Sequence, residues 1–239
     1  MKKSLSAMTL SATLIFSANS LASDREISVE ITNLTNGIYF TPLLVATHNR
    51  HTHLFELSTA ASDNLQAMAE GGNIDGLVED VTAAGGEVVA DPASGLLAPG
   101  ATAEAIIERP YKRNRYLSIV AMMLPTNDGF VGLDGLRLPK KKGTYTYYLH
   151  GYDAGTEAND EIINGAGAPG MLGIPADPGG NAGSGGVSTT LADHNQTVHI
   201  HRGNRGDNDP TGGESDLDAG VHTWQGPVAR VVIHVNDDD

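Results

Sequence analysis

The sequence predicts an all-β protein, an antiparallel β-sandwich with a short helical excursion. Apolar segments rich in Val, Ile and Tyr recur along the chain, and turns rich in Gly, Pro and Asp separate them. Several short strands divided by such turns are typical of a β-sandwich or a barrel. The absence of cysteine means that the core, or a bound metal ion, must stabilise the fold without disulfides.

The first 22 residues are expected to be a signal peptide of bacterial style. Lys2 and Lys3 give a positive start, residues 8–16 are apolar, and Ser20-Leu21-Ala22 fits a cleavage site. The apolar stretch is shorter than the ~20 residues that cross a bilayer, and no later segment approaches that length. We therefore expect a secreted, extracellular or periplasmic protein without a transmembrane segment, and a single domain over residues 24–239.

The predicted strands begin at residues 26–33, where Ile27, Val29 and Ile31 share one face. The next, residues 38–47, contains Pro42, which suits a sheet edge or a bulge. The remaining predicted strands span residues 87–90, 102–109, 115–123, 144–151, 197–202 and 228–235.

The helical excursion is predicted at residues 62–70 and 74–84, where apolar residues recur at helical spacing. Ser62 is a suitable N-cap, and a Gly-Gly pair follows each segment as a stop signal. Residues 164–190 and 203–220 contain many Gly and Pro or Asp residues and few large apolar ones, which predicts two long flexible loops.

The formal net charge of −14 becomes −16 once Lys2 and Lys3 are removed. Such acidity argues against nucleic-acid binding, because that function requires a basic surface, and it favours cations. Motifs of common enzyme classes, such as Gly-x-Ser-x-Gly, His-Glu-x-x-His or a phosphate-binding loop, are absent from the sequence. We therefore expect a binding protein rather than an enzyme.

Two acidic loops are the most specific feature of the chain. Residues 125–134 read Pro-Thr-Asn-Asp-Gly-Phe-Val-Gly-Leu-Asp, and residues 152–157 read Tyr-Asp-Ala-Gly-Thr-Glu. Each follows a β-like segment and places carboxylates beside glycine in a turn. Ca²⁺ takes about six to eight oxygen ligands from side chains, carbonyls and water. Asp128, Asp153 and Glu157 are therefore the candidate Ca²⁺ ligands.

These loops resemble those of the spondin domain, a Ca²⁺-binding β-sandwich of C2-like type. In that family a Pro-Ser-Pro-Asp-Trp-Phe-Val-Gly loop and an Asp-Ala-Gly-Thr-Asp loop supply the metal ligands. The resemblance covers residues 26–160 and 220–236 and includes a helical insertion. It departs from the family at Glu157, which replaces an Asp, at Gly129, which replaces an aromatic residue, and in the absence of cysteine.

The resemblance implies a Ca²⁺-dependent module for adhesion or matrix interaction, whose partner would be an extracellular protein or a glycan. Two other functions stay open. The first is a self-assembling filament or matrix subunit that pairs through the exposed edge of strand 26–33. The second is a periplasmic copper or zinc protein, because His199 and His201 alternate on one predicted strand and several histidines lie elsewhere.

Overall fold

The computed structural model describes residues 26–108, 113–180, 183–188 and 195–236. The predicted signal peptide lies outside these ranges. The strands are β1 (Glu26–Asn33), β2 (Tyr39–Phe40), β3 (Leu44–His48), β4 (Glu87–Ala90), β5 (Thr102–Glu108), β6 (Tyr116–Leu124), β7 (Gly129–Arg137), β8 (Gly143–Asp153), β9 (His199–Ile200) and β10 (Ala229–Val235).

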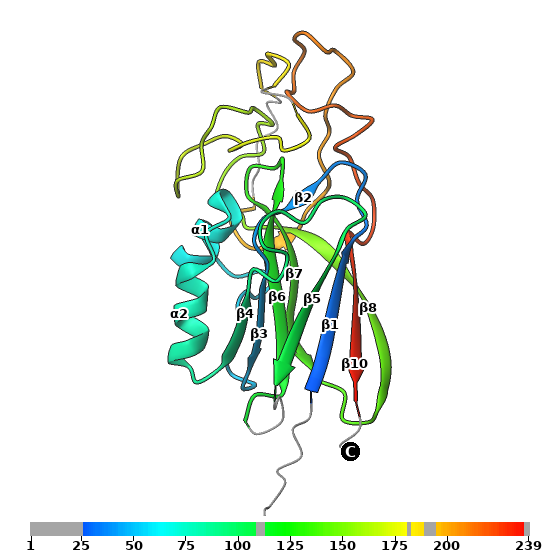
Figure 1. The fold of residues 1–239 in the computed structure, drawn as a ribbon. Coiled ribbons are helices and arrows are strands. Elements are labelled where there is room, and N and C mark those ends of the chain that lie inside the picture. Colours follow the sequence, from blue (N-terminus) through cyan, green and yellow to red (C-terminus); the bar gives the residue numbers. More distant parts are fainter. Residues whose placement is uncertain (1–25, 109–112, 181–182, 189–194, 237–239) are drawn as a thin grey trace, which may run out of the picture.

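All strand pairs are antiparallel, and the main path of the sheet runs β4-β3-β6-β7-β8-β10-β1-β5. β2 pairs with β6, and β9 pairs with β8. The sheet curls into a nearly closed, sandwich-like structure (Figure 1). The predicted all-β fold is therefore confirmed.

Most predicted strands lie within a few residues of the observed ones, but two predictions change. The segment 38–47 is divided at Pro42 into β2 and β3, because proline has no N–H to donate to a sheet. The first acidic loop is shorter than predicted: it ends at Asp128, and β7 begins at Gly129. This strand was not predicted because it contains glycines at 129, 132 and 135, and glycine is depleted in β-strands.

The structure corrects the expectation that strand 26–33 is an exposed edge. β1 pairs with β10 on one side and with β5 on the other, so its backbone groups are used. The edges of the main path are β4 and β5.

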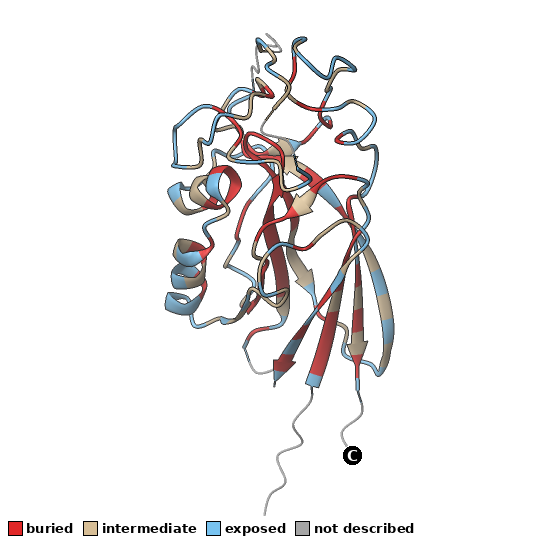
Figure 2. Cartoon of the chain, turned by 45° about the horizontal axis from the view of Figure 1, so that its top comes forward, coloured by how far each residue is buried: buried red, intermediate tan, exposed pale blue. Residues whose placement is uncertain are grey.

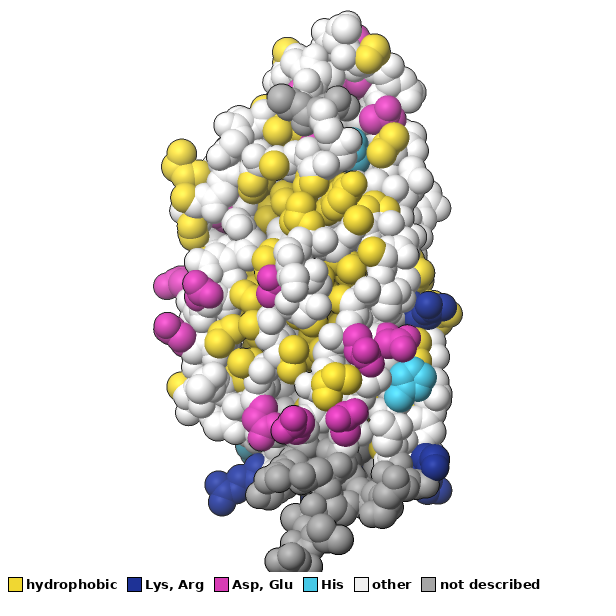
Figure 3. All heavy atoms as spheres, in the orientation of Figure 1, with side chains coloured by type: hydrophobic (Ala, Val, Ile, Leu, Met, Phe, Trp, Pro, Cys, Tyr) yellow, Lys and Arg dark blue, Asp and Glu magenta, His cyan; other side chains and the backbone are white. Residues whose placement is uncertain are grey.

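A cavity of about 250 Å³ lies between these edges, with Val89 and Ile107 among its apolar lining residues and Glu87 and Glu108 among its acidic ones. In Figure 3, which faces β4 and β5, hydrophobic side chains occupy the middle of the surface and acidic ones lie mainly along its lower part and at its left edge.

Two hydrophobic clusters form the core. One fills the space enclosed by the curled sheet and includes Ile31, Ile119 and Val231. The other lies between the outer face of β3, β6 and β7 and the two helices. β6 contributes to both, since its alternate side chains point to opposite faces, and eight of its nine residues are buried. Its continuous apolar sequence follows from burial on both sides (Figure 2).

The two predicted helices are confirmed as α1 (Asp63–Gly71) and α2 (Asp75–Ala83). The Ser62 hydroxyl accepts a hydrogen bond from the Leu65 N–H at 3.1 Å, as an N-cap does. Both helices lie on one side of the sheet, beside β3 and β4 (Figure 1).

The segments predicted as long loops contain, in their described residues, only isolated bridges. Figure 1 shows that they gather at one end of the sheet. Within the described ranges, no helix combines the length and apolarity that a membrane span requires.

Candidate metal centre

Asp128 and Asp153 meet at the end of the sheet where β7 begins and β8 ends. Gly129, the first residue of β7, is the register partner of Asp153, the last residue of β8. The Ala154 N–H donates to the Asp128 carbonyl oxygen at 3.2 Å, which continues the pairing by one step. The antiparallel ladder therefore places two acidic residues that are 25 residues apart in the sequence at neighbouring positions of the sheet.

Asp128 is fully buried, and its two carboxylate oxygens have different surroundings. Oδ2 accepts hydrogen bonds from the Thr156 N–H at 2.8 Å, the Thr156 hydroxyl at 3.1 Å and the Glu157 N–H at 3.2 Å. Oδ1 is buried and has no hydrogen-bond partner within the described part of the chain. A buried oxygen of this kind is costly unless a donor or a cation satisfies it.

The charge of Asp128 is poorly compensated by the protein itself. Burial, followed by the negative charge of Asp153, raises the pKa of Asp128 to about 8, although the hydrogen bonds from Thr156 and Glu157 act in the opposite direction. Two buried carboxylates whose charges act on each other favour the uptake of a proton or of a metal cation. The donor set therefore fits a hard cation such as Ca²⁺.

Asp153 is 2% exposed and is held by its own turn. Its Oδ1 accepts the Gly155 N–H at 2.8 Å, and its Oδ2 accepts the Asn159 side-chain amide at 2.8 Å. Gly155 has φ +71°, and a Cβ there would lie 2.6 Å from the Thr197 N atom. Only glycine fits this position, so the Asp-Ala-Gly motif fixes the orientation of the carboxylate.

The Glu157 carboxylate has other partners than the carboxylates of Asp128 and Asp153. Its Oε2 accepts the Gly173 N–H at 2.9 Å and the Asn127 amide at 3.3 Å. Burial raises its pKa to about 7, and the charges that add to this increase belong to Glu70 and Asp160. Its Oε1 is buried and, among the described residues, has no hydrogen-bond partner. Glu157 is thus linked to the Asp128–Asp153 pair through its backbone.

Within the described ranges, no three His, Asp or Glu side chains converge closely enough to hold a metal ion by themselves. A cation at the Asp128–Asp153 pair would need backbone carbonyls or water to complete its ligands, which is common for Ca²⁺. Such an ion would neutralise the two carboxylates and would link the two loops to each other.

Sequence reasoning missed the polar residues that support these loops. Asn127 is 1% exposed, donates to Asp160 Oδ1 at 2.8 Å, and accepts the Glu161 N–H at 3.2 Å. Asn159 holds Asp153, as described above. The signal was available, because the polar sequence Asn-Asp-Glu at residues 159–161 follows the second acidic loop directly.

Glu161 is a buried carboxylate that connects this region to the long loop 203–220. It is 2% exposed and accepts the N–H groups of Arg205 at 2.6 Å and Gly206 at 2.9 Å. The Ser215 hydroxyl also donates to it, at 2.7 Å. Its backbone φ of +59° is unusual for a residue other than glycine, and the three hydrogen bonds hold it there.

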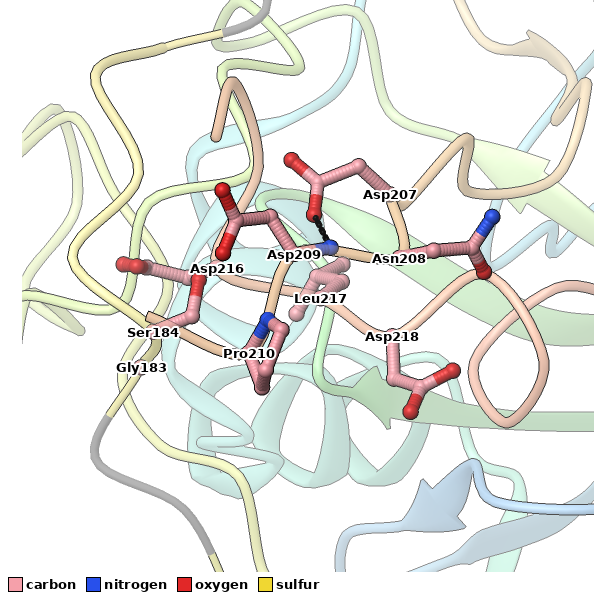
Figure 4. A pocket seen from close by; sticks show the side chains of 9 residues that line it. All are labelled: Gly183, Ser184, Asp207, Asn208, Asp209, Pro210, Asp216, Leu217 and Asp218. Carbon is pink, nitrogen blue, oxygen red and sulfur yellow. Dashed lines mark hydrogen bonds between the residues drawn. The ribbon is translucent and has the colours of Figure 1, made fainter. Parts of the chain in front are cut away.

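A second group of acidic residues lies in the long loops but differs in kind. Asp207, Asp209, Asp216 and Asp218 line a cavity of about 240 Å³, and Figure 4 shows their carboxylates pointing in different directions. Each accepts backbone N–H groups of the loops. The N–H donors of Ser215 and Asp209 lower the pKa of Asp207, the opposite of the change at Asp128. These carboxylates order the loops.

The described histidines do not gather at one site, although two of them share a hydrogen-bond network. His48 is buried and hydrogen-bonded to the Ser118 hydroxyl, which donates to Asp134 Oδ1 at 3.0 Å, and His53 lies 2.6 Å from Asp134 Oδ2. His199 Nδ1 is 3.7 Å from Asp153 Oδ1, whereas the ring of His201 packs on Trp224 at a centroid distance of 4.9 Å. His199 and His201 therefore have separate partners.

The family model described as Spondin_N matches residues 32–161, which is more than half of the 239 residues and includes both acidic loops. The chain belongs to the spondin N-terminal domain family. The match confirms the resemblance over most of residues 26–160, whereas residues 220–236 lie outside it. No curated protein matches the chain significantly. Domains of this family are typically extracellular.

In this spondin-type chain, position 129 departs from the resemblance for a local reason. A Cβ at Gly129 would lie 2.7 Å from the Thr126 hydroxyl oxygen and 3.1 Å from His201 Cδ2. The space that a larger side chain would take beside the first acidic loop is occupied by the His201 ring. His201 comes from the segment after β9, beyond the matched range.

Proposed function

We propose that this spondin-type chain is a secreted Ca²⁺-binding β-sandwich module that acts in extracellular adhesion or matrix interaction and performs no catalysis. Export would use residues 1–22 as a signal peptide. Asp128 and Asp153 are the proposed Ca²⁺ ligands at the core of the site. Glu157 is a third proposed ligand, which would have to turn its free Oε1 toward the ion.

The observation that carries the proposal is the buried Oδ1 of Asp128, which has no hydrogen-bond partner in the described chain and belongs to a carboxylate that the negative charge of Asp153 destabilises. Burying two negative charges without compensation is unfavourable, and a divalent cation removes that cost. The ion would then fix the two loops at one end of the sheet. Loops ordered in this way offer a defined surface to an extracellular protein or glycan.

Thermal unfolding with Ca²⁺ and with a chelator tests the proposal. A ligand at ~100 times its dissociation constant adds about 2.7 kcal/mol to stability, which is several degrees in melting temperature for a domain of this size. Asp128→Asn and Asp153→Asn should abolish the Ca²⁺-dependent shift. Asp209→Asn, in the second acidic cavity, should leave it unchanged. Equal melting temperatures of the unsubstituted protein in Ca²⁺ and in chelator would contradict the proposal.

The alternatives have less support from the geometry. Self-assembly through β1 lacks its basis, because β1 is paired on both sides, and any pairing of sheets would have to use β4 or β5. A copper or zinc site would need histidines that converge, and His199 and His201, which alternate on one predicted strand, have separate partners.

A further inference from the structure

A separate cavity of about 300 Å³ lies beside the candidate metal centre, on the side of β8 where β9 pairs. The residues that line it include His150, Ile200, His201, Arg202, Trp224 and Gln225. They come from β8, from β9 and the segment after it, and from the segment before β10. The cavity belongs to neither the Asp128–Asp153 pair nor the acidic loops of Figure 4.

The tryptophan of this cavity is firmly positioned. Its ring lies against the buried His201 ring, with an interplanar angle of 41°, and a Cβ at Gly151 would lie 3.4 Å from the Trp224 Nε1 atom. His201 is held in turn, because its N–H donates to the Gly151 carbonyl at 3.0 Å and its Nδ1 accepts the Gly203 N–H at 3.0 Å. The half-buried indole is thus a rigid wall of the cavity.

The cavity is attached to the first acidic loop. The Asn204 amide donates to the Pro125 carbonyl at 2.9 Å, and His201 Cδ2 lies 3.1 Å from the Cβ position of Gly129. Pro125 and Gly129 flank the loop that carries Asp128. An ion that orders this loop would therefore also steady the wall formed by His201 and Trp224.

The lining carries a charge opposite to that of the chain as a whole. The chain has 29 acidic and 15 basic residues, yet the cavity is lined by the cationic Arg202 and by no carboxylate. Arg202, His150 and Gln225 are exposed, so their polar groups are accessible to a ligand. A guanidinium binds a carboxylate through two parallel hydrogen bonds, and a Gln amide both donates to and accepts from hydroxyl groups.

We propose that this cavity binds a sugar ring that carries a carboxylate, such as a uronic acid residue of an extracellular polysaccharide. The apolar face of the ring packs against Trp224, the carboxylate pairs with Arg202, and Gln225 and His150 bind hydroxyl groups. A concave site with an apolar wall and a few polar groups is the usual form of a small-molecule site. The inference rests on the proposed extracellular function and names a class of partner for it.

Intrinsic fluorescence tests this assignment directly, since Trp224 is the only tryptophan of the chain. The probes are an unsulfated hyaluronan tetrasaccharide, which alternates glucuronate with N-acetylglucosamine, and the neutral N-acetylglucosamine tetramer. The hyaluronan fragment should change the emission of Trp224 in a saturable way, and the neutral tetramer should bind at least about tenfold more weakly, because it lacks the charged hydrogen bonds.

Substitutions separate the roles of the two main side chains. Arg202→Gln should weaken binding of the hyaluronan fragment about tenfold, whereas Arg50→Gln, an exposed arginine elsewhere, should have no effect. Trp224→Ala, measured by calorimetry, should lose binding while keeping its Ca²⁺-dependent melting shift. Equal binding of the two tetrasaccharides, no binding of either, or unchanged affinity in Arg202→Gln would overturn the inference.

The same samples distinguish this inference from the proposed function. An Asp153-dependent melting shift with Ca²⁺, together with no binding of the acidic tetrasaccharide, would leave the metal site standing and overturn the sugar site. Binding of the acidic tetrasaccharide in chelator without any Ca²⁺ shift would support the sugar site and contradict the metal site.

Discussion

The two oxygens of the Asp128 carboxylate differ in hydrogen bonding, and this difference is what makes the residue a candidate metal ligand. Oδ2 is fully satisfied by the Thr156 and Glu157 groups, and the buried Oδ1 accepts no hydrogen bond from any described residue. Asp207, by contrast, receives N–H donors at both oxygens and has a lowered pKa. Acidic residues alone therefore do not define a cation site; the lack of internal compensation does.

The raised pKa of Asp128 predicts a pH dependence of stability. A carboxyl whose pKa is about 8 in the folded chain and 3.8 ordinarily stabilises the fold fully below pH ~4, and this contribution is lost as the pH rises toward 8. In chelator, the melting temperature should therefore fall between pH 5 and 8. Saturating Ca²⁺ should remove most of this fall, because the ion favours the charged form.

Asp128→Asn provides the control for this titration. The variant lacks the titrating group, so its melting temperature in chelator should fall less over the same pH range. At pH 8 it should exceed that of the unsubstituted protein. If the two proteins lost stability in parallel from pH 5 to 8, the pKa of Asp128 would not be the cause.

Glu161→Gln should be clearly destabilising. The substitution replaces one carboxylate oxygen with an NH2 group, which cannot accept a hydrogen bond. Either the Arg205 N–H at Oε1, or the Gly206 N–H and the Ser215 hydroxyl at Oε2, then loses its acceptor, and a buried donor left without a partner costs about 1–3 kcal/mol. A chemical denaturation series measures the change. The matched substitution Glu214→Gln affects an exposed ion pair of 4.0 Å and should cost close to nothing. Equal losses in both variants would refute the role given to Glu161.

At the scale of elements, the strands and helices with clear periodicity were predictable from sequence. β1, α1 and α2 follow their apolar spacing, and β6 is an uninterrupted apolar segment because both of its faces are covered. β7 was not predictable, because glycine gives no local β signal and the side chains that lie beside Gly132, those of Phe55 and Tyr152, come from distant parts of the chain. Tertiary contacts, rather than local preference, place that strand.

The candidate site was predictable only in part, for the same reason. The motifs identified Asp128 and Asp153, which the ladder between β7 and β8 brings together. The contacts of the Glu157 carboxylate with Gly173 and Asn127 depend on how residues 158–174 cross the end of the sheet. No local pattern in the sequence specifies that path.

Hydrogen exchange with and without Ca²⁺ tests the site at the scale of elements. If the ion orders loops, its removal should reduce protection mainly at residues 125–128 and 153–159, where the two carboxylates would then repel each other. The central strands β6 and β10 should keep their protection, because their cores do not depend on the ion. A uniform loss over all strands would mean that the ion supports the whole fold instead.

At the scale of the molecule, one sheet serves as a support for loops gathered at one end (Figure 1). The metal centre, the Glu161 anchor and the Trp224 cavity are built from the segments that join β6 to β7, β8 to β9 and β9 to β10, and from the adjoining parts of β8 and β9. The sheet ends at β4 and β5 rather than at β1. Any pairing with another chain would therefore use β4 or β5, the two strands that flank the cavity of about 250 Å³. The fold thus separates a structural sheet from a loop surface whose order is proposed to depend on Ca²⁺.

A crystal structure of the protein grown with Ca²⁺ would locate the ion. We expect it about 2.3–2.6 Å from Asp128 Oδ1 and from a carboxylate oxygen of Asp153, with carbonyls or water completing its ligands. Anomalous scattering would identify the ion. A fully ordered structure with no ion at this pair, or with calcium only among Asp207, Asp209, Asp216 and Asp218, would show that the Asp128–Asp153 pair is not a Ca²⁺ site.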